Sequence, residues 1–131
     1  MYKVELIRFH PSRAKQQFSF SAAAEATKVI LEVGDEPSFI AIDNVTGNTS
    51  WGELLIWQSR GRALVQLNEH REHFASYSET SCIALEEVSF LDEDGKIFRV
   101  PLAHTISVES AKEALTYWLS TGQAISTLVW S

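Results

Sequence analysis

Residues 53–67, ELLIWQSRGRALVQL, decide the fold of this chain. Two apolar, β-favouring runs, residues 53–58 and 63–67, flank the short connection Ser59, Arg60 and Gly61. Loops of two or three residues are the commonest connections within a β-hairpin. The stretch therefore predicts two paired antiparallel strands in the middle of the chain.

A second hairpin is predicted further along. Residues 84–91 can pair with residues 97–100 across an acidic turn that ends in Gly95. Glycine supplies the positive φ that such a turn needs and that other residues resist.

Elsewhere, two further strands are predicted, over residues 2–9 and 38–42. Polar connections are predicted over residues 10–17 and 43–48. The segment 68–81 fits no single element.

The C-terminal segment, residues 106–131, predicts a helix followed by a short closing strand. Ser107 is placed to cap the helix, and Gly122 is placed to end it. The apolar residues between them fall on one stripe, which indicates a helix that packs against a sheet. This stripe consists of Val108, Ala111, Leu115, Trp118 and Leu119. Residues 127–130 then form the strand.

An earlier helix is predicted over residues 21–33, with Ser19 or Ser21 as its cap and Gly34 after its end. Together these elements predict a single α+β domain over residues 1–131. Its antiparallel sheet has about five or six strands, and the two amphipathic helices pack on one face. A chain of this length can bury a substantial core without disulfides or metals.

The acidic balance of the chain limits its partners. It has 17 acidic and 11 basic residues, a net charge of −6. Sequence-independent binding to nucleic acid needs clustered Lys and Arg, so direct nucleic-acid binding is not expected and a basic protein partner is favoured. The sequence has no run long enough to span a bilayer and no secretory signal pattern, which predicts a cytoplasmic protein that binds no membrane.

Sequence motifs for catalysis are lacking. His70 and His73 could meet on one helical turn, but the remaining ligand candidates have no spaced pattern, so no metal site is expected. Cys82 lacks the neighbours that activate a nucleophile. The glycine spacing forms no phosphate loop. We therefore expect no catalytic residues and no cofactor.

Large aromatic and acidic residues are the candidates for partner binding, because aromatic anchors and charge complementarity dominate many interfaces. Trp57 fits a core anchor better than an exposed one, Trp51 fits either, and Trp118 and Trp130 fit the core. The candidate partner-binding residues are Trp51, Glu53, Trp57, Glu86, Asp92, Glu93 and Asp94.

The chain also resembles a known family. Gly34 to Pro37 match a G-x-x-P that leads into a strand, and the strand around Trp57 matches a hairpin strand with a central aromatic residue. Residues 106–122, ISVESAKEALTYWLSTG, followed by an apolar run ending in Trp130, match the closing helix and strand. Over residues 21–130 this pattern resembles immunity protein family one of bacterial polymorphic toxin systems.

The resemblance implies a non-catalytic inhibitor that binds a co-encoded, secreted or contact-delivered toxin, often a nucleic-acid deaminase or another nuclease-like domain. No binding residue follows from it. Two alternatives stay open: a structural or assembly module that forms a homo-oligomer, and a small metal-dependent enzyme that uses His70 and His73. A weak homodimer is compatible with the first function as well.

Overall fold

The computed structural model describes residues 1–31, 36–46, 49–68, 72–77 and 86–130. Its elements follow each other as β1 (Tyr2–Arg8), β2 (Ala14–Phe20), α1 (Ala23–Leu31), β3 (Ser38–Thr46), β4 (Thr49–Ser59), β5 (Arg62–Asn68), β6 (Glu72–Tyr77), β7 (Glu87–Leu91), β8 (Ile97–Pro101), the 3-10 helix η1 (Leu102–His104), β9 (Ile106–Ser107), α2 (Val108–Thr121) and β10 (Leu128–Trp130). Among these residues no helix has the length and hydrophobicity needed to cross a bilayer.

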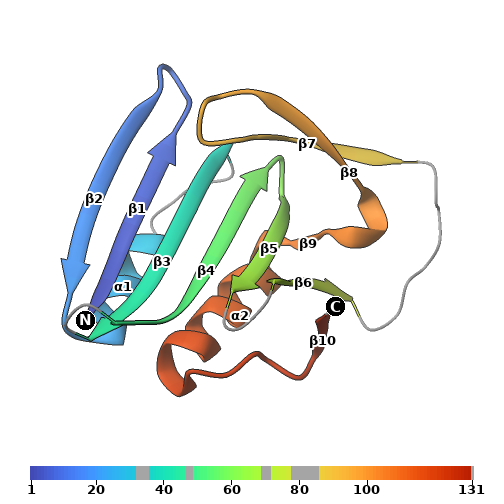
Figure 1. Ribbon diagram of the computed structural model, residues 1–131. Coiled ribbons are helices and arrows are strands. Elements are labelled where there is room, and N and C mark those ends of the chain that lie inside the picture. The colour runs from blue at the N-terminus through green and yellow to red at the C-terminus, as the bar shows by residue number, and fades with distance from the viewer. Residues whose placement is uncertain (32–35, 47–48, 69–71, 78–85, 131) are drawn as a thin grey trace.

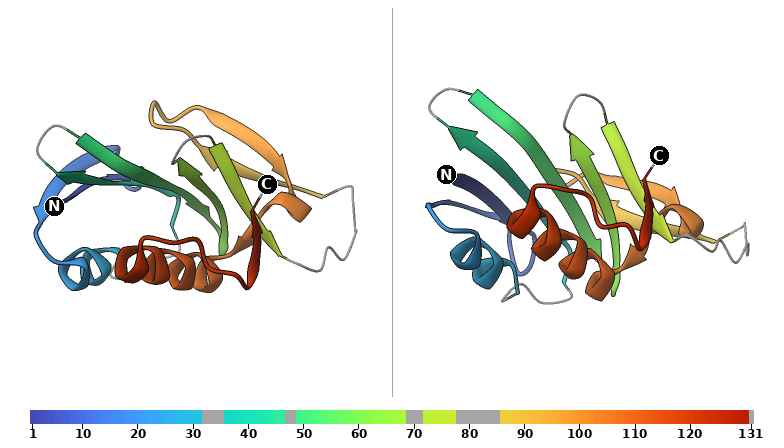
Figure 2. Two further views of the ribbon diagram at one scale, coloured as in Figure 1. Left: turned by 60° about the horizontal axis from the view of Figure 1, so that its bottom comes forward. Right: turned by 90° about the horizontal axis from the view of Figure 1, so that it is seen from below.

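One antiparallel sheet organises the molecule (Figure 1). Its six longer strands lie in the order β6-β5-β4-β3-β1-β2, and the short strands β9 and β10 add to it beside β5 and β6. Both helices cover the same face of this sheet (Figure 2). The predicted α+β class, with an antiparallel sheet and two helices on one face, is confirmed.

The central hairpin β4-β5 forms as its sequence predicts. Ser59 pairs with Arg62, so the turn consists of Arg60 and Gly61 alone. Both have positive φ, 49° and 80°. Turns with this conformation are favoured in two-residue hairpins, because their twist matches the twist of the flanking strands. Glycine takes this conformation without steric cost. Among the described residues, Arg60 is the one residue other than glycine that has a positive φ.

The main core lies between the sheet and the helices. Alternate residues of the central strands point into it, including Leu6, Ile40, Ile56 and Val65, which are opposite one another on β1, β3, β4 and β5. The predicted stripe of α2 is buried against them, together with Ala114. Trp118 is only 5% exposed, and Trp130 packs at the margin of the core and donates its indole N–H to the carbonyl of Ile125 at 2.9 Å.

The ends of α2 confirm the sequence prediction. The Oγ atom of Ser107 accepts a hydrogen bond from the backbone N–H of Ser110 at 3.1 Å, which satisfies one of the free donors at a helix start. Gly122 has a φ of 72°, and its N–H donates to the carbonyl of Trp118 at 2.7 Å. This left-handed residue ends the helix and sends the chain toward β10.

The second hairpin, β7-β8, is also confirmed, but it is a separate two-stranded sheet. It lies over one end of the sheet face that the helices leave uncovered (Figure 2). Aromatic rings join it to the sheet: Trp57 lies 5.3 Å from Phe39 and 6.1 Å from Phe98, and Phe98 lies 5.8 Å from Phe90, centroid to centroid. We call Phe39, Trp57, Phe90 and Phe98 the aromatic cluster.

Several sequence predictions were wrong in detail. Residues 14–17, expected in a connection, belong to β2, and Ser19, one of two expected helix caps, belongs to the same strand. Asp43 and Asn44, expected in a loop, lie in β3. The ambiguous segment contains the strand β6. In each case pairing with a neighbouring strand outweighs the local preference of polar residues for turns.

Candidate functional site

The sheet face opposite the helices carries a row of polar residues that crosses five strands. Lys3 of β1 is directly opposite Ser19 of β2 and Asp43 of β3, and Asp43 is opposite Glu53 of β4. Glu53 is in turn opposite Asn68 of β5. Directly opposite side chains in a sheet lie about 5 Å apart, so this row brings residues from five separate segments together.

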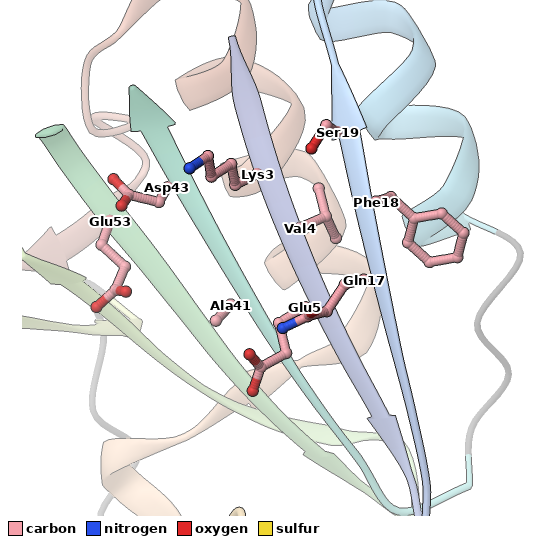
Figure 3. A pocket seen from close by; sticks show the side chains of 9 residues that line it. All are labelled: Lys3, Val4, Glu5, Gln17, Phe18, Ser19, Ala41, Asp43 and Glu53. Carbon is pink, nitrogen blue, oxygen red and sulfur yellow. The ribbon is translucent and has the colours of Figure 1, made fainter. Parts of the chain in front are cut away.

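The next row along the strands leaves a hollow. Glu5 of β1, Ala41 of β3 and Leu55 of β4 are opposite one another, and the small Ala41 sits between the two longer side chains. A cavity of about 450 Å³ opens here, with Glu5, Asp43 and Glu53 on its walls (Figure 3). The third row, with Phe39 and Trp57, is covered by the β7-β8 hairpin. The open part of the face is therefore bounded by that hairpin.

Glu53 is the carboxyl group most strongly affected by this arrangement. Partial burial raises its pKa above the usual value of 4.5, and the nearby charges of Asp43, Glu93 and Glu5 raise it further. A hydrogen bond of 3.4 Å from the side-chain amide of Asn68 acts in the opposite direction. A partly desolvated carboxylate gains more free energy from binding a cation than a fully hydrated carboxylate does. The reason is that folding has already removed part of its water.

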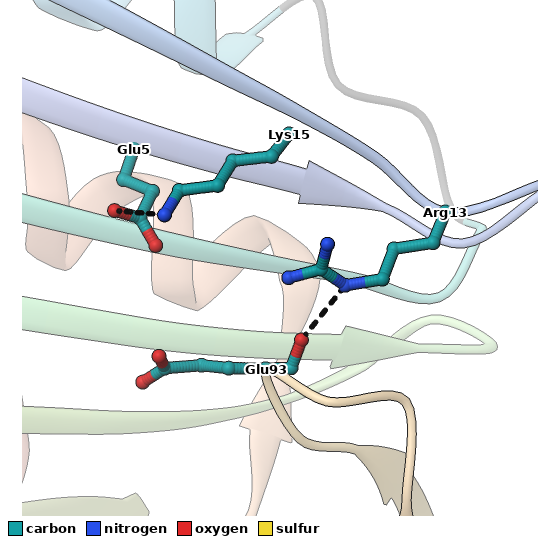
Figure 4. Close-up of polar contacts among 4 residues, drawn as sticks. All are labelled: Glu5, Arg13, Lys15 and Glu93. Carbon is teal, nitrogen blue, oxygen red and sulfur yellow. Dashed lines mark hydrogen bonds and ion pairs between the residues drawn. The ribbon is translucent and has the colours of Figure 1, made fainter.

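The turn of the β7-β8 hairpin supplies the fourth carboxylate. Arg13, in the β1-β2 turn, donates a hydrogen bond from Nε to the backbone carbonyl of Glu93 at 3.0 Å. The Glu93 side chain points over the open sheet face, on the same side of the sheet as Glu5 (Figure 4). We call the hollow lined by Glu5, Asp43 and Glu53, together with the nearby Glu93, the acidic groove.

Two lysines lie on the β1-β2 side of the groove. Lys15 forms an ion pair of 3.4 Å with Glu5, and Lys3 lines the cavity. The four carboxylates outnumber the three cations Lys3, Lys15 and Arg13, so the groove keeps a negative charge. Its groups are hydrogen-bond acceptors that suit guanidinium and ammonium groups. Chemically, the groove fits the binding of a basic surface.

The structure brings together only part of the predicted partner-binding set. Glu53 lines the groove and Glu93 lies near enough for its charge to raise the pKa of Glu53, whereas Glu86 is exposed at the base of the hairpin, away from the tip. Asp94 is exposed in the turn. Asp92 instead holds the turn: its Oδ1 accepts hydrogen bonds from the backbone N–H groups of Asp94 and Lys96, both at 2.9 Å.

The tryptophan predictions have different outcomes. Trp57 is half-buried in the aromatic cluster, so it holds the hairpin on the sheet, in agreement with the preference for a core role. The backbone of Trp51 belongs to β4, and its side chain lies outside the described part of the structure. His70 and Cys82 lie outside the described residues as well, and for His73 only the backbone position in β6 is described. The described residues contain no group of three metal-ligating side chains.

Sequence reasoning missed Glu5, Asp43 and Arg13 as site residues. The first could have been found, because the alternation of residues 2–9 places Lys3 and Glu5 on the face opposite Val4 and Leu6. Arg13 and Asp43 carry no such signal, since their roles depend on segments far away in the sequence.

The sequence matches no model of a protein family, and no curated protein is significantly similar to it.

Proposed function

We propose that this protein is an immunity protein, a non-catalytic inhibitor that binds a cognate secreted or contact-delivered toxin domain in the cytoplasm of the cell it protects. The toxin is a nucleic-acid deaminase or nuclease with a basic substrate-binding surface. The observation that carries the proposal is the acidic groove, where carboxylates of β1, β3, β4 and the β7-β8 turn gather on an uncovered sheet face.

Charge explains how such a protein could recognise its target. An enzyme that acts on nucleic acid needs Lys and Arg to contact phosphates. An acidic inhibitor is attracted to the same residues, and this attraction speeds the diffusional encounter. The net charge of −6 supports long-range attraction, and the groove supplies acceptors at close range.

Occupation of the basic surface then accounts for inhibition. A partner side chain that enters the groove meets Glu53, which is already partly desolvated, and Glu93, whose backbone carbonyl accepts a hydrogen bond from Arg13. Stable neutralisation needs an interface of roughly 1,600 Å² in total, so the exposed residues around the groove take part as well. Inhibition by this route requires no chemical step on the inhibitor.

Co-expression with the product of the gene directly upstream tests the proposal. We expect the two proteins to purify as a complex, and we expect cells that make the upstream product to survive only when this protein is present. Absence of both a complex and a rescue would overturn the proposed function.

Matched charge variants test the role of the groove. Glu53→Gln combined with Glu93→Gln removes two charges from the groove. Glu109→Gln combined with Glu113→Gln removes two from exposed positions on α2, across the sheet. We expect the groove variant to associate several-fold more slowly, with a smaller difference at high salt, and the α2 variant to behave like the wild type. Equal association rates for the two variants would remove the groove from the interface.

A further inference from the structure

The strand β2 is an open edge of the sheet. It pairs with β1 at all seven positions, and among the described residues no strand lies on its other side (Figure 1). The opposite edge of the sheet is formed by β10, which has only three residues. An edge strand presents backbone N–H and C=O groups that pair readily with a further strand. All seven side chains of β2 are exposed or half-buried, so the edge is accessible.

This edge lacks most features that prevent pairing in other proteins. Its register with β1 has no bulge, and Pro11 precedes the strand instead of interrupting it. The one charged side chain, Lys15, forms an ion pair with Glu5 of its own chain. Residues 9–24 contain no Asp or Glu, although the chain as a whole is acidic. The edge is therefore free of the carboxylates that would repel a second copy.

We propose that β2 pairs with β2 of a second copy of this chain, antiparallel and centred on Gln17, to form a symmetric homodimer with a continuous sheet. In this register Gln17 lies opposite its own equivalent, Lys15 lies opposite Ser19, and Gln16 lies opposite Phe18. Opposite residues then belong to the same sheet face in both copies, as a continuous sheet requires. The two helical layers lie on one side, and both acidic grooves stay free on the other.

The register keeps like charges apart. Because Lys15 lies opposite Ser19, the two lysines are separated by four residues along the strand, about 13 Å at the usual rise. This exceeds the screening length of roughly 8 Å at physiological salt. The pairing thus places an uncharged hydroxyl, and no second lysine, opposite each Lys15.

Aromatic packing gives the same register a favourable contact. Phe18 and Phe20 stack at 5.9 Å between centroids, and both are half-buried at the margin of the core. In Figure 3 the Phe18 ring projects past β2, away from β1. Pairing centred on Gln17 makes the two Phe18 residues diagonal neighbours, within reach of each other across the symmetry axis. Dimerisation would cover apolar surface that a single copy leaves partly in water.

Sedimentation equilibrium up to about 1 mM protein, a range that reveals weak association, tests the dimer. We expect the wild type to approach twice its monomer mass. Ser19→Lys places a positive charge opposite Lys15 of the second copy and should weaken the dimer, whereas Ser19→Glu should strengthen it. Each shift should be about 2- to 30-fold in the dissociation constant for the two symmetry-related pairs together. Ser89→Lys, at an exposed position of β7, is the charge-matched control and should change nothing.

Cross-linking tests the register. In a Cys82→Ser background, Gln17→Cys should form a disulfide-linked dimer under mild oxidation, because directly opposite residues lie within the Cα distance of a disulfide. Gln16→Cys should not, because its equivalent lies more than about 7 Å away. A wild type that stays monomeric at the highest concentration overturns the proposal. A dimer whose dissociation constant is unaffected by both Ser19 substitutions, or one cross-linked equally through both positions, overturns pairing through β2.

Discussion

The Nε atom of Arg13 donates a hydrogen bond of 3.0 Å to the backbone carbonyl of Glu93, 80 residues further along the chain. This contact joins the β1-β2 turn to the tip of the β7-β8 hairpin (Figure 4). The hairpin belongs to a sheet of its own and, in the described part of the chain, is not paired with the main sheet. Side chains, contacts of this kind and the chain itself, which continues from β8 through η1 to β9 beside β5, hold it in place. One end is fixed by the aromatic cluster, and the tip is fixed by Arg13.

Arg13→Ala should therefore loosen the hairpin tip while the main sheet stays intact. The lost hydrogen bond is exposed, so we expect the free energy of unfolding to change by less than about 1 kcal/mol. Amide hydrogen exchange should accelerate at residues 92–96 and remain unchanged in β4 and β5. Arg8→Ala, at an exposed position at the end of β1, is the matched control. Unchanged exchange at the tip would show that Arg13 does not hold it.

Glu53→Gln should stabilise the protein at pH 7. The raised pKa means that the folded state binds the Glu53 proton more tightly than the unfolded state does. Stability therefore falls as the pH rises from the usual carboxyl pKa through the raised value, and this loss persists at neutral pH. Glutamine keeps the oxygen that accepts from Asn68 and removes the charge. We expect a gain below about 1 kcal/mol, because solvent screens a partly exposed group.

Urea denaturation as a function of pH checks this sign. The difference between Glu53→Gln and the wild type should be present at pH 7 and should vanish at low pH, where Glu53 itself is protonated. Glu113→Gln, on the exposed side of α2, serves as the control for a change in net charge. A variant less stable than the wild type at pH 7 would contradict the proposed electrostatic cost of Glu53.

Elements defined by local rules could be predicted from the sequence. The turn of the β4-β5 hairpin depends on Arg60 and Gly61 alone, and α2 depends on its cap Ser107, its apolar stripe and Gly122. The strand β2 could not be predicted in the same way. Its side chains are exposed or half-buried, so they show no clear alternation, and its β structure depends on hydrogen bonds to β1.

The acidic groove was predictable only in part. Glu53 and Glu93 were candidates because of their residue types, but their proximity depends on strand order and on how the hairpin folds over the sheet. Lys3, Asp43 and Glu53 belong to strands that are neighbours in space and separate in sequence. A sequence pattern can predict the face of a strand on which a residue lies. To predict a site that crosses several strands, the order of those strands must be known as well.

Trp118→Ala should destabilise the fold strongly. Trp118 is 5% exposed and packs in the core between α2 and the sheet. Loss of a large buried aromatic side chain costs about 3 to 5 kcal/mol, a large part of the roughly 5 to 15 kcal/mol available to a domain. Tyr117→Ala, its neighbour at 39% exposure, should cost far less. Equal unfolding midpoints in urea for the two variants would contradict the core role of Trp118.

Asp92→Ala and Asp94→Ala should separate a structural carboxylate from a surface carboxylate within one turn. Asp92 accepts two backbone hydrogen bonds, from Asp94 and Lys96, whereas Asp94 is exposed and its N–H is one of those donors. Loss of the Asp92 side chain leaves both N–H groups to water, and we expect a cost of about 1 kcal/mol and faster amide exchange in β7 and β8. Asp94→Ala should stay within about 0.5 kcal/mol of the wild type. Because both variants remove one negative charge from the same turn, a purely electrostatic role would change their unfolding free energies equally, and that result would contradict the turn-forming role of Asp92.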